Sequence, residues 1–588
     1  MFKLLKNFPK KDIFLVVVVL ALICFQVFLD LRLPEYMSEI TQLINTENPE
    51  VSEILASGSK MLLCALGSMA SAMFVGYLIA NISASFSMRL RKRLFSKVEN
   101  LSMAEINRFS IASLITRTTN DITQVQMLIV MGLQMMIKAP ITAVWAIIKI
   151  LDKSWEWSAV TGAAVVILLA LVITLMAIVI PRFKIIQKLT DRLNLVVREN
   201  LTGIRVVRAF NAEKYQEKKF EKGNDDLTNT QIFSQKALSV FSPIMFFIMQ
   251  MVTVIIYFVG AFLIDGATDA QEKLLLFSNM VVFSSYAMQV IMSFLMLAIV
   301  FMMVPRAQVS AARINEVLDT EITLKEGERN VVATTETGTV EFKNVSFKYP
   351  DAEESLLNNI SFKAEKGQTV AFIGSTGSGK STLINLIPRF YDATSGEVLV
   401  DGINVKDYTF ESLYNKLGYV SQKAVLFGGT VKSNVAFGDN GKGKKSEKVI
   451  KEAIKIAQGT NFVEKMDKKY DAHIAQSGTN ISGGQKQRLS IARAIARDPE
   501  IYIFDDSFSA LDYKTDADLR QALKKHAKGA TVLIVAQRIG TIMNADQIIV
   551  LDQGKCVGKG THHELLKSCP VYLEIAKSQL AESELEGK

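Results

Sequence analysis

The residues best suited to chemistry lie in a glycine-rich loop between an apolar strand and an apolar helix. Residues Thr369–Ile373 are typical of a buried strand, and a Gly-x-x-x-x-Gly-Lys-Ser sequence follows at once. Such glycines let backbone N–H groups point at phosphate oxygens, and the helix N-terminus adds its positive dipole end. Lys380 is expected to neutralise β- and γ-phosphate charge, and Ser381 to bind Mg²⁺. The predicted phosphate-binding residues are Gly374, Ser375, Thr376, Gly377, Ser378, Gly379, Lys380, Ser381 and Thr382.

A second apolar strand, Ile501–Phe504, leads into two adjacent carboxylates, Asp505 and Asp506. In open α/β sheets, ligands bind at the carboxyl ends of the strands. Asp505 is therefore expected to hold Mg²⁺ through the hydration shell of the ion. A strand that ends in a capping Asp is common by itself, so this expectation depends on the glycine loop. Together the two elements predict a site for ATP and Mg²⁺.

A third motif, Ile481–Arg488, reads Ile-Ser-Gly-Gly-Gln-Lys-Gln-Arg and opens a helix before the second strand. It resembles the signature motif of ATP-binding-cassette (ABC) proteins, and the rest of that family's pattern follows in order. The resemblance implies that Tyr349 stacks on adenine and that Gln422 lies in the glutamine loop, near Mg²⁺. It also implies that Asp512 ends the loop after the second strand. The resemblance spans the chain, and Glu199–Phe210 matches a cytoplasmic loop of six-helix exporters.

In that family two cassettes close head to tail around two ATP molecules. Each ATP is held by the glycine loop of one cassette and by the signature of the other. A serine and glycines at a helix start form an anion-binding cup that needs a γ-phosphate from a partner. The resemblance therefore implies that this half-transporter dimerises. The signature residues implied to act on the partner's ATP are Ser482, Gly483, Gly484 and Gln485.

Two positions depart from the family pattern, and both bear on hydrolysis. The family places Glu after the Mg²⁺-binding Asp and His in the switch after the next strand; this chain has Asp506 and Gln537. A carboxylate displaced by about 1 Å costs roughly 10²-fold in rate, and Gln carries no positive charge at any pH. The pattern predicts a site that binds ATP and hydrolyses it slowly, as in the impaired subunit of bacterial heterodimeric multidrug exporters. The stretch Gly478–Arg488 resembles those subunits as well. The alternative is that Asp506 reaches the water through a shifted backbone and the site works normally.

Hydrophobic residues make up 49% of the 588-residue chain and gather before residue 305. Six segments are apolar and long enough to cross a bilayer, which takes about 20 helical residues. A soluble bundle is the alternative, but a run such as Val160–Ile180, with no charge, is tolerated only in lipid. Lys138 interrupts the third segment and is expected to line the pathway, to snorkel or to pair with the other subunit. The predicted segments are 13–33, 58–83, 126–150, 158–181, 239–264 and 277–304.

Charge alternates between the connecting loops. The loop at 34–57 is acidic, whereas those at 84–125 and 182–238 are rich in Lys and Arg. The positive-inside rule puts the two basic loops and both termini in the cytoplasm of a multi-pass protein of the cell membrane. The net charge of +9 thus follows membrane topology and does not indicate nucleic-acid binding. By position, the family's coupling helices are expected at Met103–Phe109 and Asn211–Phe220.

The expected fold is an all-α membrane domain of six helices with long cytoplasmic helical loops, followed by an α/β P-loop nucleotide-binding domain. Its divisions are a membrane domain at 1–304, a linker at 305–338, an ABC domain at 339–577 and a tail at 578–588. The predicted function is ATP-driven export of amphipathic or hydrophobic compounds, together with a second, different chain that has Glu and His. Met and Phe in the fifth and sixth segments favour such cargo, although lipid-facing or packing surface explains them equally. An ATP-gated channel, a sensing complex, an importer on the same fold and an active homodimer are the alternatives.

Overall fold

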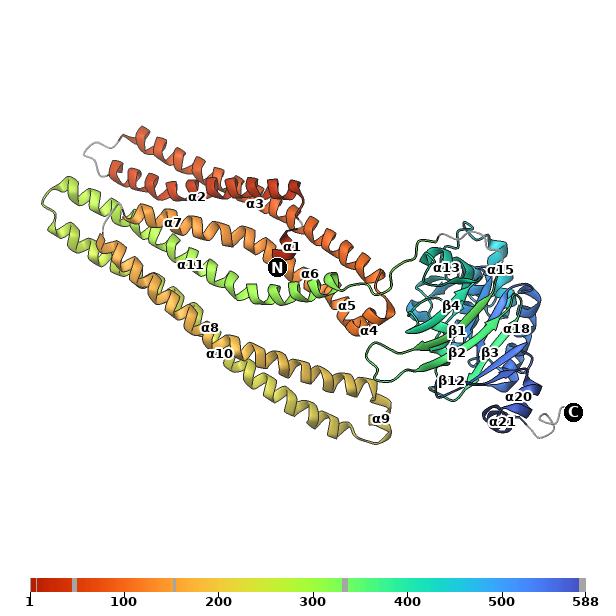
Figure 1. Cartoon of the computed structure of the whole chain (residues 1–588). Helices are drawn as coiled ribbons and strands as arrows, with labels where there is room; N and C mark the ends of the chain where they lie inside the picture. The colour runs from red at the N-terminus through yellow and green to blue at the C-terminus, as the bar shows by residue number, and fades with distance from the viewer. Residues whose placement is uncertain (1, 7, 45–49, 152–154, 330–336, 581–588) are drawn as a thin grey trace. The chain divides into compact units, whose positions relative to one another are not determined.

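A computed structural model describes residues 2–6, 8–44, 50–151, 155–329 and 337–580 (Figure 1). The chain divides into two compact units. The helical unit comprises residues 1–99 and 111–320, and the α/β unit comprises residues 100–110 and 321–588. The α/β unit therefore includes a short segment from within the first third of the chain.

The helical unit contains the six predicted membrane helices, each longer than its apolar segment. Five of the spans are the continuous helices α2 (Lys10–Ile44), α3 (Val51–Glu99), α8 (Trp155–Thr202), α10 (Glu213–Gly266) and α11 (Ala270–Asp319), and the sixth is an interrupted helix. That interrupted helix consists of α5 (Ile111–Thr118), α6 (Asn120–Met131), a π-helical turn (Gly132–Met136) and α7 (Ile137–Leu151). The helices α1 (Phe2–Leu5) and α9 (Ile204–Ala209) are short. The helices are longer than predicted because their polar extensions keep the helical pattern beyond the apolar segments.

Pro305 does not end the sixth helix, so the predicted linker at 305–338 is wrong at its start. Helix α11 continues to Asp319. A proline removes one backbone hydrogen bond, but the residues after it form a buried stripe at helical spacing. The buried residues of this stripe are Ala307, Ala311, Ile314 and Val317. Burial of the stripe favours continued helix, and residues 330–336 of the predicted linker lie outside the described residues.

Lys138 pairs within its own chain. Its Nζ lies 3.2 Å from Oδ2 of Asp30 in α2, and the Ser68 hydroxyl of α3 donates to the other oxygen of that carboxylate. Nearer the end of the same helix, Lys149 Nζ lies 2.8 Å from Glu35 Oε1. A charge in a membrane helix is costly unless a partner or a cavity compensates it. The ion pair of Lys138 is thus made with α2 of its own chain and not with the other subunit, and the two other expected roles stay predictions.

The α/β unit contains a largely parallel sheet, as predicted, with strand order β12-β11-β3-β10-β9-β6 and only β12 antiparallel. Its strands are β3 (Thr369–Gly374), β6 (Leu417–Val420), β9 (Ile501–Asp505), β10 (Thr531–Val535), β11 (Gln547–Asp552) and β12 (Lys555–Gly560). A second, antiparallel sheet has the order β2-β1-β4-β5. Its strands are β1 (Val340–Phe347), β2 (Leu357–Ala364), β4 (Ser395–Val400) and β5 (Ile403–Asn404), and β7 (Gly429–Thr430) pairs with β8 (His473–Ile474). Strands β9 and β10 are buried along their whole length, which explains their continuous apolar sequences.

Helices surround these sheets, and one of them comes from the early segment of the chain. They are α4 (Met103–Phe109), α12 (Lys380–Asn385), α13 (Phe410–Lys416), α14 (Val431–Val435), α15 (Glu447–Ile456), α16 (Thr460–Val463), α17 (Gly483–Ile495), α18 (Tyr513–His526), α19 (Ile539–Ile542), α20 (His562–Ser568) and α21 (Pro570–Lys577). Helix α4 has the bounds predicted for the first coupling helix. The buried carboxylate of Glu105 accepts from the Ser102 backbone N–H (2.6 Å) and from the Thr323 hydroxyl (2.6 Å). It thus ties α4 to the segment that follows α11.

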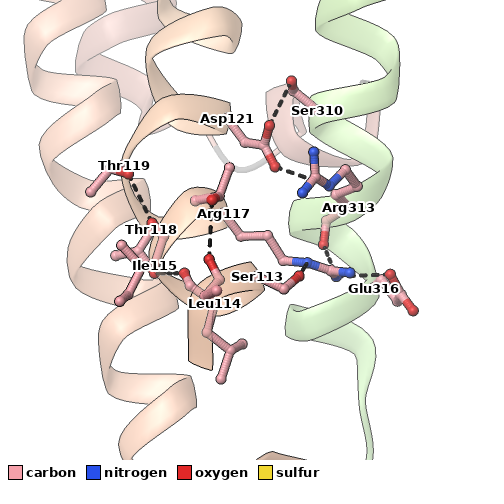
Figure 2. Close-up of polar contacts among 12 residues, drawn as sticks. Ser113, Leu114, Ile115, Arg117, Thr118, Thr119, Asp121, Ser310, Arg313 and Glu316 are labelled. Atoms are coloured by element: carbon pink, nitrogen blue, oxygen red, sulfur yellow. Dashed lines mark hydrogen bonds and ion pairs between the residues drawn. The ribbon is translucent and has the colours of Figure 1, made fainter. Parts of the chain in front are cut away.

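In the helical unit, polar side chains tie the α5–α6 segment to the end of α11 (Figure 2). Arg117 Nη1 lies 2.8 Å from Glu316 Oε2 and donates to the Arg313 carbonyl at 2.8 Å. Asp121 accepts from the Ser310 hydroxyl at 2.9 Å and lies 3.4 Å from Arg313 Nε. The helix that follows residues 100–110 and the helix that precedes residue 321 are therefore joined to each other within the helical unit.

Within this network, Asp121→Asn is expected to destabilise the protein more than Glu316→Gln. Asp121 is 4% exposed, so loss of its charge removes a compensated interaction from the interior, at a cost of about 1–3 kcal/mol. The Glu316 side chain is 49% exposed, and such pairs contribute about 0–1 kcal/mol. The thermal unfolding midpoint of each full-length variant in lipid nanodiscs measures the difference. Equal midpoints would contradict the role assigned to Asp121.

Candidate functional site

The glycine loop joins β3 to α12, as predicted, and its glycines are required by close contacts. Gly374 has φ +156°, and a Cβ there would lie 2.0 Å from the Leu551 carbonyl oxygen. Gly379, with φ +94°, precedes the first residue of α12, and a Cβ there would lie 2.6 Å from Leu357 Cδ2. Any side chain at either position would displace β11 or β2, so the loop can follow this path only with glycine.

Lys380 lies folded over the loop that it follows. Its Nζ donates to the carbonyls of Gly374 (2.9 Å) and Ser375 (2.7 Å). Burial lowers the pKa of Lys380, while the nearby carboxylates of Asp506 and Asp505 raise it. The ammonium group is thus held by neutral carbonyls at the loop, where a phosphate would provide a stronger, charged partner.

The two strand ends meet through Ser381 and Asp505. The Ser381 hydroxyl donates to Asp505 Oδ1 at 2.7 Å, which joins the start of α12 to the end of β9. Burial raises the pKa of Asp505, and the adjacent Asp506 carboxylate adds to this effect, against the hydrogen bond from Ser381. A hydroxyl and a carboxylate at this distance are suitable ligands for Mg²⁺ or its water shell. The structure therefore places two of the three residues predicted for the magnesium site side by side, and the third, Gln422, contacts the adjacent Asp506.

Asp506 is held between two glutamine side chains. Gln537 Nε2 donates to Asp506 Oδ2 at 2.7 Å, and Gln422 Nε2 donates to the same oxygen at 3.3 Å. The backbone of Asp506 has φ +46°, and its carbonyl accepts from the Ser509 hydroxyl at 2.9 Å. Burial raises the pKa of the Asp506 carboxyl, against the opposing effects of the Gln422 hydrogen bond and of the nearby Lys380 and Arg538 charges. The glutamine loop, the second strand and the switch thus meet at one carboxylate oxygen.

The predicted adenine-side tyrosine contacts the glycine-loop helix. The Tyr349 hydroxyl lies 2.9 Å from Thr382 Oγ1, and its ring packs edge-on against those of Phe347 and Tyr391. Tyr391 accepts a hydrogen bond at 3.3 Å from Asn107 of α4. The sequence motifs did not single out Tyr391 or Asn107, because this contact joins residues far apart in the chain.

The signature residues start α17 and make their hydrogen bonds within its first turn. Ser482 is the N-cap, and its hydroxyl accepts from the Gln485 backbone N–H at 3.4 Å. In return, Gln485 Oε1 accepts from the Ser482 backbone N–H at 3.0 Å. Ser482 and Gly483 are exposed, and Gly484 has the Ala510 carbonyl as its neighbour. Asp512 caps α18 in the same way, by accepting from the Thr515 N–H at 3.0 Å.

The second coupling helix was expected at Asn211–Phe220, and the structure differs there. The short helix between the long helices α8 and α10 is α9, at Ile204–Ala209, and most of the expected range belongs to α10. Figure 1 shows α9 at the end of the paired helices α8 and α10. Asn211 has φ +48° and breaks the helix before α10 starts at Glu213. The prediction failed because the charged sequence after Asn211 is as helical as the one before it.

Comparison with known proteins identifies both units. Residues 15–294 match the family described as ABC transporter transmembrane region, and residues 357–509 match the family described as ABC transporter. The chain is 38% identical to an uncharacterized ABC transporter ATP-binding protein of Mycobacterium bovis, over 90% of this chain and 88% of that one. It is 32% identical to the ATP-dependent lipid A-core flippase of Pseudomonas aeruginosa, over 84% of this chain and 80% of that one. A bacterial Atm1-family ABC exporter with ATP bound has the same fold, with a TM-score of 0.79, 24% identity and coverage of 98% of this chain and 99% of that one.

Tyr349→Ala is expected to weaken ATP binding about tenfold or more, and Tyr349→Phe less than threefold. The phenylalanine ring keeps the stacking face, worth about 1–3 kcal/mol per base, and loses only the bond to Thr382. Fluorescent ATP-analogue titration of the full-length protein in nanodiscs measures both affinities. Equal losses in the two variants would show that the hydroxyl, and not the ring, provides the binding.

Proposed function

The chain belongs to the ABC transporter family, as a half-transporter of the exporter type, and from this premise we propose a heterodimeric exporter subunit. Its own nucleotide site binds ATP with Mg²⁺ and hydrolyses it slowly. Hydrolysis takes place mainly at the other composite site, formed by this chain's signature and the glycine loop of a different partner. The partner has Glu and His at the two substituted positions.

The surroundings of Asp506 are the observation that carries the proposal. Its carboxylate is one methylene shorter than the glutamate of the family pattern, and one of its oxygens already accepts from both Gln422 and Gln537. A base for the attacking water must lie within hydrogen-bond reach of that water, and the two glutamine bonds restrain this shorter carboxylate through one of its oxygens. Gln537 supplies a hydrogen bond in place of the positive charge that a histidine can supply. Positioning and electrostatic stabilisation are the two main sources of catalysis in phosphoryl transfer, and both are reduced here.

The contrast with the signature supports the assignment of two unequal sites. Ser482–Gln485 keeps the family pattern, caps α17 and exposes its first residues to solvent. A complete ATP site needs this surface opposite a glycine loop, and a single cassette cannot supply both halves to one nucleotide. The proposed dimer thus uses the intact half of this chain at the productive site and keeps its substituted half for ATP binding.

The helical arm of α8, α9 and α10 supports assembly with a second subunit. Its tip carries exposed apolar side chains, with Val206 61% and Phe210 78% exposed. Beside them a cavity of about 400 Å³ is lined by apolar residues such as Val196, Leu201 and Phe220. Apolar groups gathered at the end of a polar helical extension favour contact with another protein surface. We assign this tip to the interface with the partner.

Amphipathic or hydrophobic compounds are the proposed cargo. The methionines and phenylalanines of α10 and α11 divide between packing and exposed positions: Met245, Met249 and Met280 are buried, whereas Phe246, Phe247 and Met292 are exposed. Only the exposed set is available to a cargo, a partner or lipid. The similarity to a lipid A-core flippase favours an amphiphile with a polar head and apolar chains. The proposed location is the cell membrane, with both termini and the α/β unit in the cytoplasm.

The direct test is the ATPase rate of the full chain alone in nanodiscs, beside the chain co-purified with a partner ABC half-transporter that has Glu and His at the two substituted positions. The proposal expects roughly 1% or less of the complex rate from the chain alone, in line with the loss that a displaced base causes. The double variant Asp506→Glu with Gln537→His should raise the rate of the chain alone about 10²-fold, because its signature can complete a homodimeric site.

Lys380→Ala added to that double variant is the matched control, and it should abolish the restored activity. This result would place the hydrolysis at this chain's own glycine loop. Brisk hydrolysis by the unchanged chain would instead show that Asp506 is a working catalytic carboxylate, and the proposal of a slow site would be wrong.

A further inference from the structure

Gln579, in the turn after α21, holds the switch from outside the recognised motifs. Its Oε1 accepts from the Ile539 backbone N–H at 2.8 Å, and its Nε2 donates to the Gln537 carbonyl at 2.8 Å. One side chain therefore makes hydrogen bonds on both sides of Arg538 and fixes the backbone on which Gln537 stands. No sequence motif pointed to Gln579, since it lies 40 residues after Ile539.

The base from which Gln579 reaches is firmly packed. Tyr572 of α21 is fully buried, and its hydroxyl lies 2.7 Å from Nδ1 of the buried His562 in α20. Ala576 is also fully buried, and the Leu580 backbone N–H donates to the Ala576 carbonyl at 2.9 Å. The side chain of Gln579 is thus carried by a turn that follows a helix anchored in the core of the α/β unit.

The switch is fixed at its other end by the central sheet. The Ala536 N–H donates to the Phe372 carbonyl of β3 at 3.1 Å, and the Asp506 N–H donates to the Val535 carbonyl at 3.0 Å. Between Ala536 and Ile539 the backbone has β3 as its support on one side and Gln579 on the other. From this short span the side chain of Gln537 donates to Asp506 at 2.7 Å. Loss of either support leaves the Gln537 side chain free to sample other positions.

We propose that Gln579 is a positioning residue for the nucleotide site: the C-terminal turn fixes the backbone at 537–539 so that Gln537 faces Asp506 and the γ-phosphate of bound ATP. This inference rests on the proposed function in so far as it expects the site to retain its ATP. Both hydrogen bonds of Gln579 go to main-chain atoms, so the same clamp acts on whichever side chain stands at position 537. The C-terminal helices thereby take part in nucleotide binding without touching the nucleotide.

Retention of ATP by the full-length transporter in nanodiscs tests the proposal. The complex is loaded with Mg²⁺ and radiolabelled ATP and chased with unlabelled ATP, and the half-time of release of intact ATP is measured. Gln579→Ala should shorten this half-time about three- to tenfold, as expected when the hydrogen bond of Gln537 to the γ-phosphate is weakened but not lost. Gln579→Glu keeps the acceptor for Ile539 and loses the donor to Gln537. Its half-time should therefore lie between that of the unchanged protein and that of Gln579→Ala. Lys577→Ala, an exposed change at the end of α21, should leave the half-time unchanged.

A double-mutant cycle separates positioning from general loosening. In a Gln537→Ala background the side chain to be positioned is gone, and Gln579→Ala should then have no further effect on ATP release. The same fold-change in both backgrounds, or a wild-type half-time in Gln579→Ala, would overturn the proposal. Rapid hydrolysis of the retained ATP by the unchanged site would overturn the slow-site function alone. In that case the ATPase turnover of Gln579→Ala is the test. A positioning role predicts a lower kcat than that of the unchanged protein with the same KM, and equal kcat values would refute it.

Discussion

The two adjacent carboxylates at the end of a buried strand determine which other groups must lie in the nucleotide site. Burial raises the pKa of Asp505 and of Asp506, and each must be compensated by groups brought from other segments. Ser381 contacts the first, and Gln422 and Gln537 contact the second. Strand β9 lies between β6 and β10, so the loops after these strands meet the two carboxylates. The order of strands in the sheet therefore decides which loops can respond to the presence of a nucleotide.

The same requirement, that a buried charge needs a nearby partner, organises the helical unit. Asp30 lies against Lys138, and Glu35 lies against Lys149, in helices whose sequences are otherwise apolar. Arg117 and Asp121 are buried next to α11 and pair with residues of that helix. Because a broken pair in such surroundings leaves an uncompensated charge, these contacts restrict how α2, α6, α7 and α11 can move past one another. Motions of the unit are therefore expected to keep these pairs and to take place elsewhere.

Local patterns were predicted well from the sequence, and distant contacts were not. The six apolar segments, the glycine loop and the two carboxylates depend on neighbouring residues, and the structure has each of these elements at its predicted place. The bounds of α4 were expected instead from the resemblance to the family, and the structure has a helix there. The end of α11 was missed because Pro305 is a local signal, whereas the buried stripe after it depends on packing against other helices. Tyr391, Asn107 and Gln579 were missed for the same reason: their hydrogen bonds join segments between 40 and 284 residues apart. The roles of the site residues in binding and hydrolysis remain predictions that the proposed variants test.

Gln537 in place of the family's histidine has a different physical consequence from Asp506 in place of the family's glutamate. Asp506 is still a carboxylate, so a modest movement of its backbone would bring it back toward a water molecule. Its φ of +46°, in a tightly constrained turn, opposes that movement. Gln537 is an amide, and no movement can give it a positive charge. Its hydrogen bond to Asp506 also restrains that carboxylate. A switch of this kind can sense a γ-phosphate by a neutral hydrogen bond and does little to promote its cleavage. Both substitutions are therefore consistent with the proposed function, in which the nucleotide stays bound at this site and the signature of the same chain acts at the partner's site.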